Sequence, residues 1–444
     1  MQSRTAVAVG LLFGLLSSHA YAQDGRTPDR PFEETSAGRA MQRITFGAID
    51  CTDPPVCSTD AFTTSGLFIN GTYKDTRLNY ANLAGQADVS NSLLQLIVAQ
   101  SQTFPNASTA SGFTFTIGPS QRPELESRLY GPLFGERALT NGKKHLSVTL
   151  NAHNLRFKSL NGSQVRNADS GLLWGDTNYD LAGGGYVGIC RMDIDTTSVF
   201  AAANYGLAEK LDVSLAVPIV HTSVEGSNEF LDFVFVNNQL GPSTFEPQGR
   251  YFVKGSSTGL GDIAVGAKYA FVRKADAGVA LSLRASLPTG SLDDMTGTGE
   301  FQTAVNFISS FERQGFSPHV NIGYIFANGD VFDEANYNIG LGYTAVADRL
   351  TVGGELVGRR LFNVTQFSGA RELGFITSPV SGEQFLVRDF VPVERDENLV
   401  FFAVGGKVRI AGQVLASMYF VLPTGSSGLH VMRPTLNVGI NLAR

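Results

Sequence analysis

Residues 261–287 read Gly-Asp-Ile-Ala-Val-Gly-Ala-Lys-Tyr-Ala-Phe-Val-Arg-Lys-Ala-Asp-Ala-Gly-Val-Ala-Leu-Ser-Leu-Arg-Ala-Ser-Leu, two alternating segments around one tight turn. Successive side chains of a β-strand point to opposite faces, so each segment has two faces. One face is apolar and contains Ile263, Val265, Ala267, Tyr269, Phe271, Val279, Leu281, Leu283 and Ala285. The other face is small or polar and contains Asp262, Ala264, Gly266, Lys268, Ala280, Ser282, Arg284 and Ser286. The stretch therefore predicts an antiparallel hairpin with one apolar face.

The same alternation continues from about residue 144 to the end of the chain, in roughly a dozen segments of about 10 to 15 residues. The connections between these segments alternate in length. Tight links occur at 205–210, 273–276, 312–315, 347–349 and 410–412. Wider polar stretches occur at 160–189, 225–258, 288–299, 328–335, 362–397 and 424–431. Short turns at one end and long loops at the other are typical of membrane β-barrels. We therefore expect an all-β fold, a transmembrane antiparallel β-barrel of about 12 strands over residues 144–444.

The two faces of the predicted strands have different surroundings in a barrel. A charge that faces lipid near the bilayer midplane costs roughly 2–4 kcal/mol, so the polar face lines the lumen. We expect Ile263, Val265 and Leu283 to face lipid, and Asp262, Lys268 and Arg284 to face the lumen. A half-exposed soluble sheet shows the same alternation. Charged residues make up only 17% of the chain, below the roughly 25% of soluble domains, and this favours the barrel.

Residues 1–22 have the pattern of a secretory signal peptide. Arg4 supplies a positive charge, the apolar run 5–16 follows, and Ala20-Tyr-Ala22 matches a cleavage site. A membrane anchor helix is the alternative, but the apolar run is too short to span a bilayer. We expect export to the outer membrane of a Gram-negative bacterium, with outer-membrane lipid and the barrel-assembly machinery as partners. The net charge of −6 argues against nucleic acid as a partner.

Residues 23–143 do not alternate, and we expect them to form a plug inside the barrel. Residues 23–40 are polar and predicted to be mobile, whereas 88–100 has the pattern of an amphipathic helix with Leu93 and Ile97 on one face. Cys51 and Cys57 lie close in sequence, and in an oxidising periplasm they are predicted to form a disulfide. The alternative to a gating plug is a segment that only braces the barrel.

Four further stretches form a recognisable set: Gly259-Leu-Gly-Asp-Ile-Ala-Val-Gly-Ala-Lys-Tyr269, Leu287-Pro-Thr-Gly-Ser291, Gly297-Thr-Gly299, and the segment from Thr103-Phe-Pro105 through Ser111-Gly-Phe-Thr-Phe115 to Glu136-Arg-Ala-Leu-Thr140. They resemble the outer-membrane family named for the meta-pathway of phenol degradation. The second stretch recurs in part as Leu422-Pro-Thr-Gly-Ser426. The resemblance implies a relation to barrels that import hydrophobic compounds, such as the long-chain fatty-acid transporters, which also carry an N-terminal plug.

We therefore expect a channel for passive uptake of small hydrophobic compounds, aromatics or fatty acids. Two alternatives stay open: a structural or surface-binding barrel without a transport role, and a narrow general porin. The lumen lining discriminates, because a porin has a ring of charge and a hydrophobic-compound channel has an apolar pocket beside the plug. The sequence contains no H-E-x-x-H or P-loop motif, and we expect no enzyme, and no cofactor or metal site. Candidate residues of the solute path are Leu93, Ile97, Phe104, Phe113, Phe115, Phe134, Asp262, Lys268, Arg284, Glu355 and Arg359.

Overall fold

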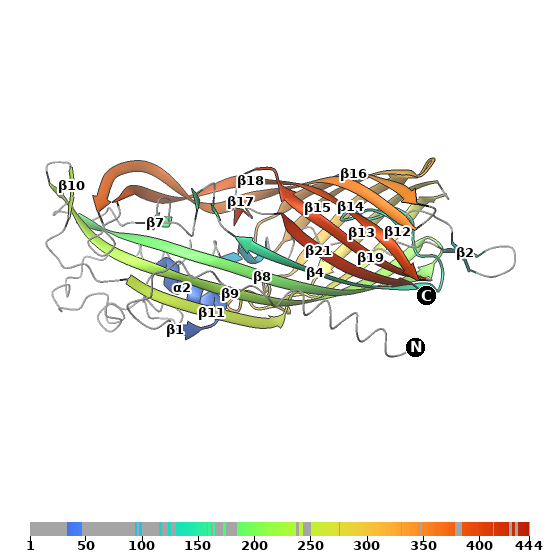
Figure 1. Ribbon diagram of the computed structural model, residues 1–444, viewed down its shortest axis with the longest axis horizontal. Coiled ribbons are helices and arrows are strands. Elements are labelled where there is room, and N and C mark those ends of the chain that lie inside the picture. Colours follow the sequence, from blue (N-terminus) through green and yellow to red (C-terminus); the bar gives the residue numbers. More distant parts are fainter. Residues whose placement is uncertain are drawn as a thin grey trace.

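The fold is a long β-barrel, seen from the side in the computed structural model of Figure 1. The structure describes residues 33–46, 94–95, 97–99, 115–117, 123–125, 130–157, 159–160, 163–164, 172–174, 184–236, 239–242, 250–274, 276–329, 331–346, 349–377, 384–411, 413–425, 429–430 and 434–443. The signal peptide, Cys51, Cys57, Leu93, Phe104 and Phe113 lie outside the described residues. None of the helices in the described part of the chain has the length and hydropathy needed to span a bilayer.

Twelve antiparallel strands form the closed wall, as the sequence predicts. They are β4 (Leu146–Phe157), β8 (Gly184–Ala208), β9 (Leu211–Val236), β12 (Ala264–Arg273), β13 (Ala277–Ser286), β14 (Gln302–Phe311), β15 (Phe316–Ala327), β16 (Glu334–Val346), β17 (Leu350–Thr377), β18 (Gln384–Ala411), β19 (Val414–Pro423) and β21 (Thr435–Ala443). Pairing runs in that order from β8 through β9 to β21, and β21 then pairs with β4, which returns to β8. Each of these twelve strands is therefore paired on both sides, and the ring that they form has no free edge.

The remaining elements are short, apart from one strand and one helix. They are β1 (Glu33–Thr35), α2 (Ala37–Phe46), β2 (Phe115–Ile117), β3 (Pro123–Leu125), β5 (Ser159–Leu160), β6 (Ser163–Gln164), β7 (Leu172–Trp174), β10 (Gln239–Pro242), β11 (Arg250–Leu260) and β20 (Leu429–His430). The strands β2 and β3 form a separate hairpin, which lies beyond the right-hand end of the barrel in Figure 1.

The two ends of the barrel differ. The turn end carries the tight connections, for example between β8 and β9 and between β18 and β19, and the chain's last strand ends there (Figure 1). The opposite end, here called the extended end, is formed by β8, β9, β17 and β18, which are 25 to 28 residues long. The expected strand length of about 10 to 15 residues and the expected long loops at 225–258 and 362–397 were wrong in these places. The chain there stays in paired hairpins, because a polar sequence can continue a ladder wherever a partner strand supplies the hydrogen bonds.

The predicted faces are confirmed. Val265, Leu283 and Leu436 are exposed on the outside of the wall, while Asp262 and Lys268 are buried on the inside. Other large apolar side chains are exposed on the outside along the whole ring, among them Val148, Leu215, Phe307, Ile322, Ile339, Leu356, Val404 and Met418. Exposed aromatic side chains lie toward the strand ends, including Tyr205, Tyr269, Phe311, Phe326 and Tyr343. An apolar belt with aromatic edges is the outer surface of a barrel that spans the outer membrane.

One wall strand is interrupted at residues 261–263. The strand β9 pairs with β12 near the turn end and then with β11, so β11 and β12 are two parts of one strand. Pro218 of β9 faces the interruption and has no N–H to donate to a ladder. Thr289 repairs the break, since its hydroxyl donates to the Gly261 carbonyl over 2.7 Å and accepts from the Ile263 N–H over 2.9 Å. The Leu-Pro-Thr-Gly motif at 287–290 therefore has a structural role.

Candidate functional site

The lumen at the turn end is crossed by residues 130–141, here called the strap. Its residues are buried, except that Gly131 and Glu136 are partly exposed. The strap has little regular structure, so its backbone N–H and C=O groups need partners from elsewhere. Lumen-facing side chains of the wall supply them.

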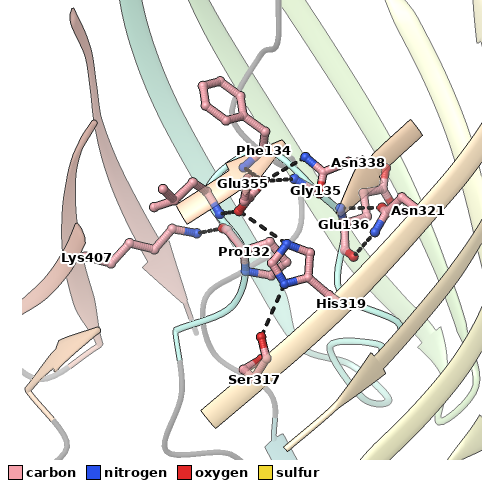
Figure 2. Close-up of polar contacts among 11 residues, drawn as sticks. Pro132, Phe134, Gly135, Glu136, Ser317, His319, Asn321, Asn338, Glu355 and Lys407 are labelled. Atoms are coloured by element: carbon pink, nitrogen blue, oxygen red, sulfur yellow. Dashed lines mark hydrogen bonds and ion pairs between the residues drawn. The ribbon is translucent and has the colours of Figure 1, made fainter. Parts of the chain in front are cut away.

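Glu355 of β17 is the main anchor of the strap (Figure 2). Its carboxylate accepts hydrogen bonds from the backbone N–H of Leu133 and, over 3.0 Å each, from those of Phe134 and Gly135. The Asn338 side-chain amide donates a further bond over 2.7 Å. A carboxylate with several N–H donors is a strong acceptor, because these hydrogen bonds are charge-assisted.

His319 completes this cluster from β15, which β16 separates from β17. Its Nε2 lies 3.4 Å from Glu355 Oε1, and its Nδ1 lies 3.3 Å from the Ser317 carbonyl oxygen. Gly340 of β16 stands between His319 and Glu355 in the register, and a Cβ there would collide with both side chains. The glycine therefore lets the two side chains meet across three strands.

Two lysines of the wall bind carbonyl groups of the strap backbone, whereas Glu355 binds its N–H groups. The Lys407 ammonium donates to the Pro132 carbonyl, and the Lys268 ammonium donates to the carbonyls of Arg137 and Leu139 over 3.0 and 3.2 Å. Both lysines are buried. A buried charge without such partners would be costly, so the lysines and the strap depend on each other.

Further wall side chains fix the strap along its length. The Asn321 side chain accepts a hydrogen bond from the Glu136 N–H over 2.7 Å and donates one to the Glu136 carbonyl over 3.1 Å (Figure 2). Ser310 accepts from the Ala138 N–H, and Asp212 accepts from the Asn141 N–H over 2.9 Å. These contacts come from β9, β14 and β15, so the strap is held from several sides of the ring.

The lumen toward the extended end is closed by apolar packing instead, and we call this the apolar layer. It contains Ala37, Ala40, Met41 and Ile44 of α2, with Leu94, Ile97 and Val98 from a second helical stretch. They pack against wall side chains that include Phe157, Ile194, Val224, Val253, Leu361, Val364 and Leu399. The helix predicted at 88–100 is confirmed at the described residues 94–95 and 97–99.

The expectation that residues 23–40 are mobile was wrong for the described part, because β1 and α2 are ordered there. Ser36 is the N-cap of α2: its hydroxyl accepts from the Arg39 N–H over 3.4 Å. The apolar residues of α2 recur at 37, 40, 41 and 44, the spacing of one helix face. That spacing was present in the sequence and could have identified the helix.

A cavity of about 240 Å³ lies in the lumen beside the strap. Its lining comes from β4, β8, β9 and the strands from β12 to β17, together with Phe134, Gly135 and Glu136 of the strap. Most lining side chains are polar and small, such as Ser214, Ser282, Asn306 and Asn336. The aromatic side chains Phe134 and Phe200 also line it. The cavity is thus mixed, with polar side chains beside apolar surface, whereas the expectation was an apolar pocket beside the plug.

Three of the five charged side chains in the lining, Arg359, Glu334 and Asp262, have hydrogen-bond partners. Arg359 binds Glu334 through two hydrogen bonds, of 2.9 and 2.5 Å. Asp262 accepts from the N–H groups of Gly290 and Thr298 and from the Thr298 hydroxyl, over 2.7 to 2.9 Å. Asp262 therefore fastens the 287–301 connection inward, over the interruption between β11 and β12.

The structure brings together many of the predicted site residues. Asp262, Arg284, Arg359 and Phe134 line one cavity, and Ile97 belongs to the apolar layer. Glu355 and Lys268 anchor the strap instead of facing open space. The backbone of Phe115 lies in β2. Sequence reasoning missed His319, Asn338 and Lys407, and strand parity alone could have placed these three in the lumen.

The family described as "Putative MetA-pathway of phenol degradation" matches residues 182–371, which confirms the resemblance over that part of the chain. No curated protein matches the chain. An outer membrane channel from Pseudomonas putida F1 is similar in structure, at 12% identity and TM-score 0.43, over 71% of this chain and 99% of that one.

Two further solved structures are similar at lower scores. A mutant of TodX, a monoaromatic hydrocarbon channel, matches at 7% identity and TM-score 0.32, over 68% of this chain and 90% of that one. A Pseudomonas aeruginosa FadL homologue matches at 11% identity and TM-score 0.29, over 68% and 89%.

Proposed function

We propose that the protein is an outer-membrane channel for small hydrophobic compounds. The premise is that its residues 182–371 match the family described as the putative MetA-pathway of phenol degradation. The compounds would be aromatics or fatty acids, taken up passively. The barrel would be assembled by the barrel-assembly machinery, and we propose no catalytic role. Residues 23–143 would act as the plug and residues 144–444 as the barrel.

The observation that supports this function best is the apolar layer. An ordinary porin keeps a water-filled lumen, whereas this lumen is packed with Met41, Ile44, Leu94, Ile97 and Val98 against an apolar wall. Apolar surface inside a barrel offers an apolar solute a partition site, since removing such surface from water is favourable by about 25 cal/mol per Å². Small shifts of the helical segments would open and close that site.

A second candidate function, a narrow general porin, is favoured by the lining of the cavity. Arg284, Arg359, Glu334 and Asp262 bring charge to one level of the lumen. A path that passes through both the apolar layer and the cavity would suit solutes with an apolar body and a polar group. The two candidates therefore predict different solutes, and an uptake experiment separates them.

The experiment uses proteoliposomes that contain lipopolysaccharide, which slows the entry of apolar compounds through the lipid itself. Influx of naphthalene and of arabinose is measured with the full mature chain and with protein-free vesicles. We expect the protein to accelerate naphthalene influx and to leave arabinose influx unchanged. Faster arabinose influx with no effect on naphthalene would establish the porin instead. No acceleration of either solute would leave a structural or surface-binding barrel.

A further inference from the structure

Arg284 differs from the other arginine in the cavity. It lies on the lumen face of β13, exposed to the cavity, and no hydrogen bond or ion pair involves it within the described part of the chain. Arg359, in contrast, has its carboxylate partner Glu334. An ionisable side chain within a membrane span is costly, and one that lacks a protein partner points to a functional contact.

The wall around Arg284 leaves space for a bound molecule. Its register partners on both sides are small, Gly266 on β12 and Ala304 on β14. Ser282 and Ser286 are the next lumen-facing residues on β13 itself. A guanidinium with small neighbours can present its fork of N–H donors to an incoming anion, a geometry that suits carboxylates and other planar or tetrahedral oxyanions.

The same cavity also offers an apolar surface. Phe134 and Phe200 line it, together with Pro218 and Ile325. At about 240 Å³ its volume falls below the roughly 300–1,000 Å³ of pockets for drug-sized ligands, so it accommodates a body of about one ring. Aromatic side chains favour a flat ring, because offset-stacked and edge-to-face contacts stabilise such pairs.

We propose that Arg284 forms a lumenal subsite for small organic anions, in which the guanidinium binds the carboxylate or sulfonate and the aromatic lining receives a one-ring body. The inference rests on the proposed channel function and specifies its solutes as amphipathic anions. Glu136 is the other charged side chain of the lining for which the described contacts show no side-chain partner. Its negative charge weakens binding of the same anion.

The test compares benzenesulfonate with benzyltrimethylammonium, two permanently charged one-ring ions that do not cross lipid. Their fluxes are measured in proteoliposomes with the full mature chain and with the variants Arg284→Gln, Arg284→Lys, Glu136→Gln and Arg409→Gln. Arg409 follows Lys407 on the same face of β18, and it lies outside the cavity lining, so its variant is the matched control. Heat-modifiable mobility on gels verifies that each barrel is folded.

We expect Arg284→Gln to lower benzenesulfonate flux roughly ten-fold, the effect of one lost charge-assisted contact. Benzyltrimethylammonium flux should stay the same or rise. Arg284→Lys should keep part of the anion flux, Glu136→Gln should raise it, and Arg409→Gln should leave it unchanged. In addition, benzenesulfonate should reduce the chloride current of single wild-type channels in a concentration-dependent way, a measurement that needs no variant.

Equal benzenesulfonate flux in the wild type and in Arg284→Gln, with no block of chloride current, would overturn the inference. The naphthalene assay separates this failure from a failure of the proposed function. If naphthalene influx persists while benzenesulfonate flux is the same with and without Arg284, only the anion subsite is refuted. If naphthalene influx is absent, the hydrophobic-compound function fails as well.

Discussion

The two levels of the lumen differ in the interactions that hold them, although one apolar cluster, which includes Leu133 and Phe134 of the strap, reaches both. Toward the extended end, α2 and the helical stretch at 94–99 fill the barrel with apolar side chains, and packing is non-directional. At the turn end, the strap is held by directional hydrogen bonds from Glu355, Lys407 and Lys268. Apolar packing tolerates small shifts, whereas a hydrogen-bonded anchor is either formed or lost. The apolar level is therefore suited to yield to a solute, and the polar level to act as a fixed constriction.

The most severe way to break the polar level is Glu355→Ala. The change leaves three strap N–H groups unpaired in a buried site, and removing one partner of a buried charged network costs about 3–5 kcal/mol. We expect the strap to leave its position and single-channel conductance to rise several-fold, while the barrel stays heat-modifiable. Glu225→Ala is the control. The Glu225 carboxylate lies as far as 4.0 Å from the Lys254 ammonium, and this ion pair is partly exposed. Unchanged conductance in a folded Glu355→Ala barrel would mean that the strap does not restrict the path.

The corresponding change in the apolar level is Ile44→Asn. Ile44 is fully buried, and an amide without a hydrogen-bond partner there costs about 1–3 kcal/mol in addition to the lost apolar packing. We expect limited proteolysis to cleave the chain near α2 in this variant, and naphthalene influx to change without a large rise in ion conductance. Arg39→Gln, on the exposed side of the same helix, should behave like the wild type. A conductance rise equal to that of Glu355→Ala would remove the distinction between the two levels.

A smaller effect is expected from Gly135→Ala. A Cβ at position 135 would lie 2.7 Å from the Asn338 side-chain oxygen and 3.0 Å from the His319 ring. Relieving that overlap moves the strap away from Glu355 at a cost of about 1–3 kcal/mol. Conductance should rise less than in Glu355→Ala. The control is Gly425→Ala, because nothing lies within 4 Å of a Cβ built there. If both glycine variants match the wild type, the contact of Gly135 with the wall is not tight in solution.

The smallest effect is expected outside both levels, at Arg360→Ala. Arg360 donates to Asp396 over 2.8 Å on an exposed part of β17 and β18. Such surface pairs contribute about 0–1 kcal/mol. Thermal unfolding followed by gel mobility should shift by little, and conductance and uptake should not change. A clear conductance change would show that this outer pair influences the lumen.

The prediction of a disulfide between Cys51 and Cys57 stays open, since both residues lie outside the described part of the chain. The same holds for Phe104, Phe113 and Leu93 as members of the solute path. For Phe115, only the backbone is described, in β2.

The number of strands and the two faces of their membrane-spanning parts could be predicted from the sequence alone. Period-2 alternation is a local property, and lipid on one side makes every error of parity costly, so Val265 and Leu283 were placed correctly without a structure. The long strands β17 and β18 were not predictable in the same way. Their polar halves are strands because each has the other as a hydrogen-bonding partner, and pairing is not visible in either segment.

The contents of the lumen were decided by the tertiary structure. Lys407 binds Pro132 across 275 residues of sequence, and Glu355 binds Leu133 across 222. Strand parity indicates that Glu355 and Arg284 both face the lumen, but parity does not distinguish them. Glu355 became an anchor because three N–H groups of the strap reach it, and Arg284 stayed accessible because Gly266 and Ala304 beside it are small. Such differences depend on which segment fills the space opposite, and only closure of the ring fixes that.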